Sequence, residues 1–225
     1  SGTGASLTFP ASVTLPAGLT LTEKLGSSGT ATNYSVITTA SALQAINTDA
    51  TSLAGNYALG ANIDLNGVTW TPIGTAASPF SGKFEGLGNR ISNLSIVNAT
   101  LPSSAQGLFR SSTGSIRNVG VTNIAITNGY QYTGGLVGEN QGSISNSYTT
   151  GSIAVASSGS ITGGLVGFNG GSISNSYSSV TVAGGDNQTG GLVGSNENGT
   201  ISNSYALGSV SGTNNVGGLV GISSS

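Results

Sequence analysis

A block of 27 to 29 residues recurs along the C-terminal half of the chain, and this recurrence limits the fold more than any other feature. GGLVG stands at 134–138, 163–167, 190–194 and 217–221. Each of the first three copies is followed by GSISNSY or GTISNSY, and weaker copies of the two blocks are QGLFRSS at 106–112 and GSIRNVG at 114–120. Leucine-rich repeats need a Leu-rich segment that is missing here, and propeller blades need about 40 residues. The repeat therefore predicts a parallel β-solenoid with one coil per block.

Aligning the blocks predicts which side chains point into the solenoid, because successive residues of a strand face opposite sides. Three columns are predicted to face inward: Ile91, Ile116, Ile144, Ile173 and Ile201; Leu94, Val119, Ser147, Ser176 and Ser204; and Ile96, Val121, Thr149, Ser178 and Ala206. The column between the last two is predicted to face outward: Ser95, Gly120, Tyr148, Tyr177 and Tyr205.

A column of asparagines is predicted to form a corner of the coil: Asn93, Asn118, Asn146, Asn175 and Asn203. Asparagine tolerates the left-handed backbone of a tight turn, and stacked amides can hydrogen-bond along the stack. Further strand positions are indicated by Ile153, Val182 and Val210 and by Val137, Val166, Val193 and Val220. We therefore expect two or three short strands per coil.

The chain before residue 106 is less regular, and we divide the sequence into three parts. Residues 1–56 are predicted to form an irregular β segment with one short helix at about 39–47, 57–105 the entry coils, and 106–225 the repeat coils. Residues 7–22 and 57–67 have strand patterns, and the helix is expected to cover an edge or flank of the solenoid. The last residues, GGLVGISSS, begin another coil, so we expect further repeats to follow in a larger chain.

Composition excludes several classes of function. The chain has 38 Gly, 5% charged residues, no Cys, no His and a mean hydropathy of +0.14. Five Lys and Arg against a net charge of −2 cannot neutralise phosphates, so no nucleic-acid partner and no anionic membrane surface is expected. No apolar run is long enough to insert in a membrane. Without Cys, and with Asn where calcium-binding solenoids repeat Asp, no metal and no cofactor is expected.

The pattern GGLVG-x-N-x-G-x-I-x-N-S-Y resembles the GLUG repeat of bacterial surface proteins. Upstream, NYALGANIDLNGVTWTPIG at 56–74 and FSGKFEGLGNRISNLSI at 80–96 are similar to the segment that precedes such repeats in filamentous-haemagglutinin-type exoproteins. The resemblance covers roughly 38–221. It implies an all-β chain folded as a right-handed parallel β-helix, part of a long secreted adhesin that is exported through a partner outer-membrane pore (two-partner secretion) and displayed on the bacterial cell surface. It supplies no catalytic residues.

The function expected from this resemblance is attachment to a polysaccharide, a cell-surface receptor or another surface, in biofilm formation or host adhesion. The candidate ligand-binding residues are Tyr148, Tyr177 and Tyr205, whose rings could stack on sugars beside Ser, Thr and Asn hydroxyls and amides. The alternative for these tyrosines is a ladder that only reinforces neighbouring coils. The alternative for the whole chain is a structural stalk or spacer.

Two more distant alternatives concern chemistry and ice. Without His or Cys, the usual nucleophile and base pairs cannot form, which leaves only paired carboxylates for polysaccharide cleavage. Glu139 and Glu197 are the first and third residues after their copies of GGLVG and could lie on one edge, but two solvated surface charges are the simpler interpretation, and no enzyme is expected. An ice-binding face needs Thr repeated in one column, and Thr149, Thr150, Thr162, Thr181 and Thr189 are not predicted to share one.

Overall fold

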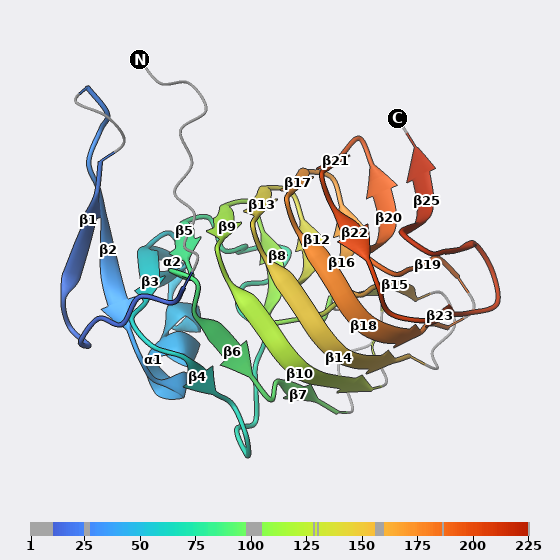
Figure 1. Cartoon of the computed structure of the whole chain (residues 1–225), viewed down its shortest axis with the longest axis horizontal. Coiled ribbons are helices and arrows are strands. Elements are labelled where there is room, and N and C mark those ends of the chain that lie inside the picture. The colour runs from blue at the N-terminus through green and yellow to red at the C-terminus, as the bar shows by residue number, and fades with distance from the viewer. Residues whose placement is uncertain are drawn as a thin grey trace.

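The chain winds into a parallel β-solenoid of about six turns with about 28 residues per turn, in a computed structural model of residues 1–225. The structure describes residues 11–24, 28–97, 105–127, 129, 131–155, 160–185 and 187–224. Figure 1 shows the coils stacked from the N-terminal end to the C-terminal end like a short rod. The predicted fold class is therefore confirmed.

Four sheets, named A to D here, run along the solenoid. Sheet A contains, in spatial order, β1 (Thr20–Glu23), β2 (Thr32–Ile37), β3 (Asn56–Leu59), β5 (Lys83–Glu85), β9 (Ser115–Arg117), β13 (Ser143–Ser145), β17 (Ser172–Ser174) and β21 (Thr200–Ser202). Sheet B contains β22 (Tyr205–Ala206), β18 (Tyr177–Ala183), β14 (Tyr148–Ala154), β10 (Gly120–Thr127), β6 (Arg90–Ser92) and β4 (Ile63–Asp64), with β23 (Val210–Ser211) beside β18 and β7 (Ser95–Ile96) beside β10.

The other two sheets lie on the part of each coil that carries GGLVG. Sheet C contains β25 (Val220–Ser224), β20 (Val193–Glu197), β16 (Val166–Asn169), β12 (Val137–Asn140) and β8 (Phe109–Ser112). Sheet D contains β11 (Tyr132–Gly134), β15 (Ile161–Gly163), β19 (Thr189–Gly190) and β24 (Val216–Gly217).

A regular coil thus has four strands, and the prediction of two or three was wrong. The paired glycines make the difference, because they let the chain turn sharply between β11 and β12. A Cβ added to Gly134 would lie 2.2 Å from the carbonyl oxygen of Val137, so no other residue fits this turn without rearrangement. Ile153 and Val182, which were assigned to a strand of their own, instead continue the strands that begin at Tyr148 and Tyr177.

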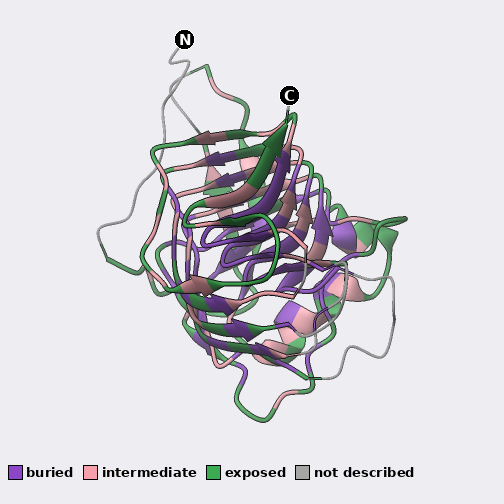
Figure 2. Ribbon diagram, turned by 90° about the vertical axis from the view of Figure 1, so that its right-hand side faces the viewer, coloured by how far each residue is buried: buried purple, intermediate pink, exposed green. Residues whose placement is uncertain are grey.

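The inward columns fill the interior of the coils, which Figure 2 shows as buried strands enclosed by exposed turns. Ile116, Ile144 and Ile173 are at most 1% exposed. The aromatic ring of Phe109 packs between Phe80 and Phe84, with ring centroids 5.1 and 5.3 Å apart. Serines also occupy inward positions, and their hydroxyls are satisfied by the nearby backbone: Ser147 and Ser176 each donate to a carbonyl at 2.8 Å. From Ile116 onward the inward columns are confirmed.

The asparagine corner is also confirmed. Asn118, Asn146, Asn175 and Asn203 have φ between 47° and 55°, the left-handed region that asparagine tolerates best after glycine. The side-chain amide of Asn146 donates to the Oδ1 atom of Asn118 at 3.1 Å. The amide therefore does two things at once: it permits the turn and ties one coil to the next.

The predicted alignment of residues 91–96 was wrong, because Ile91 lies in sheet B and not in sheet A beside Ile116. Ile91 pairs with Val121, and Ile96 with Ile126, rather than with Ile116 and Val121. The position beside Ile116 is taken by Phe84, which is fully buried. Asn93 consequently lies next to Asn123, which donates to it, and has left the corner column. Ser95 pairs with Ala125, so it is not in the column of Gly120 either.

The predicted helix is present and continues further than expected. Helix α1 (Ala40–Gln44) runs into a 3-10 turn, η1 (Ala45–Asn47), and a second helix, α2 (Ala50–Leu53), follows. The Thr39 hydroxyl caps α1 by accepting from the amide of Ala42 at 3.2 Å. Asp49 caps α2 in the same way. Asp49, a favoured helix N-cap residue, could have predicted the second helix from the sequence. None of the described helices is long and apolar enough to cross a membrane.

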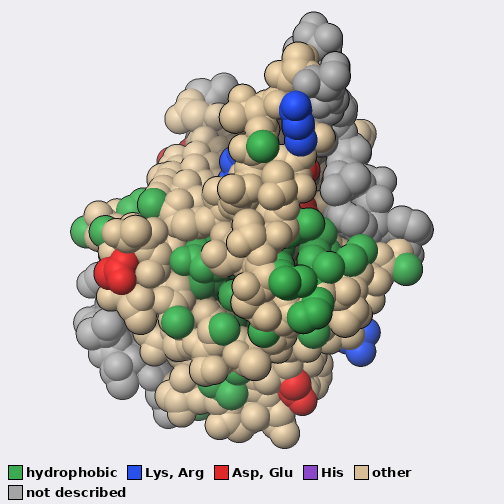
Figure 3. Space-filling model, turned by 90° about the vertical axis from the view of Figure 1, so that its left-hand side faces the viewer, with side chains coloured by type: hydrophobic (Ala, Val, Ile, Leu, Met, Phe, Trp, Pro, Cys, Tyr) green, Lys and Arg blue, Asp and Glu red, His purple; other side chains and the backbone are tan. Residues whose placement is uncertain are grey.

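The N-terminal segment lies against the first coils. Residues 57–67 contain β3 and β4, as predicted, and β1 pairs antiparallel with β2, while residues 7–10 of the predicted strand segment lie outside the described residues. The backbone amides of Val13 and Leu15 donate to carbonyls of Leu87 and Gly60. Val13, Leu15 and Leu21 pack on Tyr34. Figure 3 looks at this end, where hydrophobic side chains gather in one patch with charged side chains around it.

One charge cluster joins this segment to the solenoid across sheet A. The Arg117 guanidinium contacts Glu23 of β1 and, 2.7 Å away, Glu85 of β5. Glu85 is 2% exposed. It also accepts from the backbone amide of Leu87, and both of its carboxylate oxygens accept from Nδ2 of Asn118 at 3.0 Å. Burial raises the pKa of the Glu85 carboxyl, although these hydrogen bonds and Arg117 oppose the rise.

Candidate functional site

The three candidate tyrosines lie in one straight row on the outer face of sheet B, as predicted. They begin strands β14, β18 and β22, and parallel pairing places Tyr148 beside Tyr177 and Tyr177 beside Tyr205. Their rings are stacked face to face, with centroids 5.0 and 5.1 Å apart and planes within 4° of parallel. Burial and the two neighbouring phenols raise the pKa of the Tyr177 hydroxyl.

This stack covers most of the ring faces. Both faces of Tyr177 contact a neighbouring ring. The remaining face of Tyr148 rests on Gly120, since a Cβ added there would lie 2.3 Å from the Cζ atom of Tyr148. Tyr205 is 48% exposed, and the row as a whole presents ring edges. Contacts of a sugar to Tyr148 and Tyr177 would therefore be edge-on.

Hydroxyl groups extend the row sideways. Thr150 pairs with Ser179 and Ser152 with Thr181, and alternation along the strands places these side chains on the same outer face as the tyrosines. The result is a flat array of donors and acceptors repeated at the spacing of the coils.

A second asparagine ladder, inside the coil, was missed by the sequence analysis. Asn140 donates to Asn169, and Asn169 donates to Asn196, each at 2.7 Å. Asn140 and Asn169 are fully buried. Each amide also donates to the backbone carbonyl of the following turn, at Gly142, Gly171 and Gly199. The signal was present, because these are the asparagines of the GGLVG-x-N pattern.

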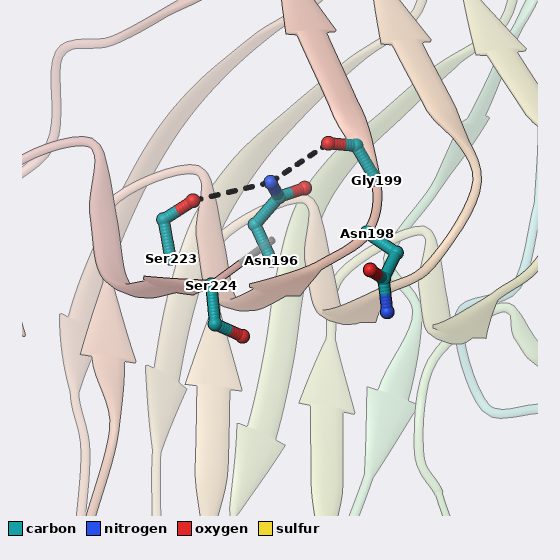
Figure 4. Close-up of a pocket in the computed structure, with 5 residues that line it drawn as sticks. All are labelled: Asn196, Asn198, Gly199, Ser223 and Ser224. Atoms are coloured by element: carbon teal, nitrogen blue, oxygen red, sulfur yellow. Dashed lines mark hydrogen bonds between the residues drawn. The ribbon is translucent and has the colours of Figure 1, made fainter.

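This ladder ends at an open pocket of about 450 Å³ in the last coil. Figure 4 shows Asn196 between Ser223 and the carbonyl of Gly199, with Asn198 and Ser224 at the sides. Asn196 donates to the Ser223 hydroxyl at 3.3 Å. The lining is polar and contains no charged side chain, so the pocket offers amide and hydroxyl contacts only.

The two carboxylates considered for catalysis are on sheet C but not side by side. Glu139 is on β12 and Glu197 on β20, with β16 between them, which separates the two strands by about 10 Å. Phe168, not a carboxylate, is the partner of Glu139 on β16. The Glu197 carboxylate accepts a hydrogen bond from Ser195. In the described residues no three or more acidic side chains come together to hold a metal ion.

Threonines do repeat in one column, contrary to the prediction. Thr133, Thr162 and Thr189 pair along sheet D and are fully buried. They directly precede GGLVG, a position left out of the alignment. Because their hydroxyls point away from water, this column cannot order water at the surface.

Comparison with known proteins gives the repeats their identity. The GLUG motif matches residues 129–154, 158–183 and 185–211. Three of the repeats thus match the GLUG motif. Each GLUG coil contributes one tyrosine to the outer row, one asparagine to the left-handed corner and one asparagine to the buried ladder.

Two known proteins are similar over longer stretches. Halomucin from Haloquadratum walsbyi is 33% identical over 139 residues, which is 56% of this chain and 2% of halomucin. The chain thus spans about 2% of the length of that relative. The crystal structure of a putative immunoglobulin A1 protease from Bacteroides ovatus has 22% identity and a TM-score of 0.58 over 83% of this chain and 70% of the other. At that identity the likeness concerns the fold alone.

Proposed function

We propose that this chain is a solenoid segment of a large protein exported to or displayed on the cell surface, where it attaches to polysaccharide on cells or surfaces. Two similarities support this location. The chain matches a small fraction of a much larger protein, halomucin, and shares its fold with a protein named for acting on immunoglobulin, an extracellular molecule. The resemblance to filamentous-haemagglutinin-type exoproteins adds three finer proposals: export through a partner pore, a role in biofilm or host adhesion, and further repeats beyond residue 225.

The observation that carries the proposal is the outer face of sheet B. Tyr148, Tyr177 and Tyr205 form an unbroken row 5.0 to 5.1 Å from ring to ring, beside the hydroxyl columns of the same strands. A polysaccharide repeats hydroxyls along its length, so a rigid face that repeats donors and acceptors can engage several sugars at once. Individually weak contacts then add through effective concentration.

The test is binding of the purified chain to an array of neutral and acidic polysaccharides. Tyr205→Ala removes the most exposed ring of the row and should weaken binding about tenfold, the loss expected for one aromatic contact of about 1.4 kcal/mol. Thr200→Ala, an exposed change on sheet A, is the matched control and should change nothing. Binding that Tyr205→Ala and Tyr177→Ala both leave intact would remove sheet B from the proposal.

A stalk without a ligand is the second candidate function, and the ladders favour it. The tyrosine rings contact one another, and the side-chain amides of Asn140, Asn169 and Asn196 hydrogen-bond between neighbouring coils. Both rows therefore stiffen the rod. A stalk binds no polysaccharide on the array. For either function we propose that Glu139 and Glu197 catalyse no reaction. Incubation of the chain with the polysaccharides of the array, followed by an assay for shortened polysaccharide chains, tests this.

A further inference from the structure

A second aromatic group lies on the other side of the solenoid, where sheets C and D meet. The rings of Tyr132 on β11 and Phe168 on β16 are 5.1 Å apart and tilted by 39°. Both side chains are half-buried. This pair does not come from the repeat: the partner of Tyr132 on β15 is Ile161, and the partners of Phe168 are Glu139 and Ser195. Stacking of equivalent residues on successive coils therefore does not account for it.

A carboxylate stands beside the aromatic pair. Glu139 and Phe168 are directly paired on neighbouring parallel strands, so their side chains leave the same face of sheet C about 4.8 Å apart. Burial raises the pKa of the Tyr132 hydroxyl, and the negative charge of Glu139, and less strongly that of Glu197, raises it further. Both carboxylates are thus close enough for their field to reach the phenol.

Among the described residues no ion pair joins Glu139 to a Lys or Arg; the cation nearest in register, Arg110 on β8, directly precedes Ser111, the strand partner of Glu139. All five Lys and Arg lie at or before residue 117, and among the described residues the two ion pairs are both made by Arg117. The coils that carry Tyr132, Glu139 and Phe168 therefore contain carboxylates and no cation. An aromatic face beside a carboxylate without an ion pair is complementary to a ligand that is apolar on one side and positively charged on the other.

We propose that Tyr132, Phe168 and Glu139 form a binding site for a sugar that carries a protonated amine, such as the deacetylated amino sugars of a cationic polysaccharide. The aromatic rings contact the C–H face of the sugar, and Glu139 pairs with its ammonium group. A neutral sugar leaves the carboxylate without a partner, and an acidic sugar is repelled. The site is separate from the tyrosine row on sheet B and shares with the proposed function only its location at a surface.

The test compares a glucosamine hexamer with an N-acetylglucosamine hexamer by titration calorimetry of the whole chain. A mildly acidic buffer keeps the amines of the glucosamine hexamer protonated. The glucosamine hexamer should bind at least about tenfold more tightly, and added salt should weaken it. Glu139→Gln, which keeps the size of the side chain, should lower the affinity about tenfold, and Tyr132→Ala by a similar factor.

Two control variants keep the result interpretable. Asp64→Asn removes an exposed carboxylate at the far end of sheet B, and Tyr177→Ala changes the other aromatic row; both should bind the glucosamine hexamer like the unchanged chain. Equal affinity for the two hexamers, no saturable binding, or an equal loss in Asp64→Asn and Glu139→Gln would overturn the proposal. Failure of this site would leave binding of neutral or acidic polysaccharides to sheet B standing, because those ligands and variants differ.

Discussion

Replacing Arg117 with Ala is expected to lower the free energy of unfolding by about 3–5 kcal/mol, the cost of removing one partner from a buried ion pair. Glu85 would keep its buried position, with hydrogen bonds from Leu87 and Asn118, but would lose the one counter-charge it has in the described part of the chain. The loss would also remove the ion pair of Glu23, although β1 would keep its pairing with β2.

Equilibrium denaturation monitored by circular dichroism measures this change. Without Arg117 the pKa of Glu85 rises further, so the folded variant binds a proton more readily than the unfolded one. Its stability is then greatest below the unfolded pKa of a glutamate, about 4.3, and is lost as the pH rises through the raised pKa. Lys83→Ala, an exposed cation of the same sheet that bonds Thr32, should cost less than about 0.5 kcal/mol. A loss below about 1 kcal/mol at neutral pH for Arg117→Ala would contradict this account.

Replacing Asn169 with Ala is expected to lower the free energy of unfolding by about 3 kcal/mol. The change removes the hydrogen-bond partner of three groups, at about 1–3 kcal/mol each, and relaxation of the surroundings recovers part of this loss. These groups are the amide of Asn140, the carbonyl of Gly171 and the Oδ1 atom of Asn196. Water cannot readily reach the amide of Asn140, which is fully buried.

The same ladder supplies the control for Asn169→Ala. Ser223 accepts from Asn196 at the open end, where solvent can replace it, so Ser223→Ala should cost less than about 0.5 kcal/mol. Equal losses in the two variants, measured by denaturation, would show that burial of the ladder does not determine its contribution.

The sequence predicted the periodic part of the structure because each coil repeats the same physical constraints. Inward Ile144 and Ile173, the left-handed turns at Asn146 and Asn175, and the outward tyrosines all follow from alternation and turn chemistry applied to the aligned blocks. The register of Ile91 failed for the opposite reason. There Phe84, not Ile91, is the residue beside Ile116 in sheet A. The similar letters ISN at 91–93 belong to sheet B, which is the next sheet along the chain.

The candidate sites were less accessible to sequence reasoning, since they depend on side-chain geometry between coils. Alternation placed Tyr177 on the surface but could not show that its two faces are covered by Tyr148 and Tyr205. The pair of Tyr132 and Phe168 joins residues 36 positions apart on two sheets, and no repeat marks it. Sequence periodicity therefore predicts the rod, and the departures from periodicity lead to its sites.

The most direct test of the solenoid is removal of one whole coil. Deleting residues 137–165 joins Leu136 to Val166, restores the GGLVG motif and places Phe109 beside Val166 and Gly120 beside Tyr177. We expect this variant to fold, to unfold cooperatively, and to be about 4.8 Å shorter in small-angle X-ray scattering. Deleting residues 137–150, about half a coil, destroys the register and should leave the chain largely unfolded. An unfolded whole-coil variant, or equal folding of both variants, would contradict the stacked-coil account.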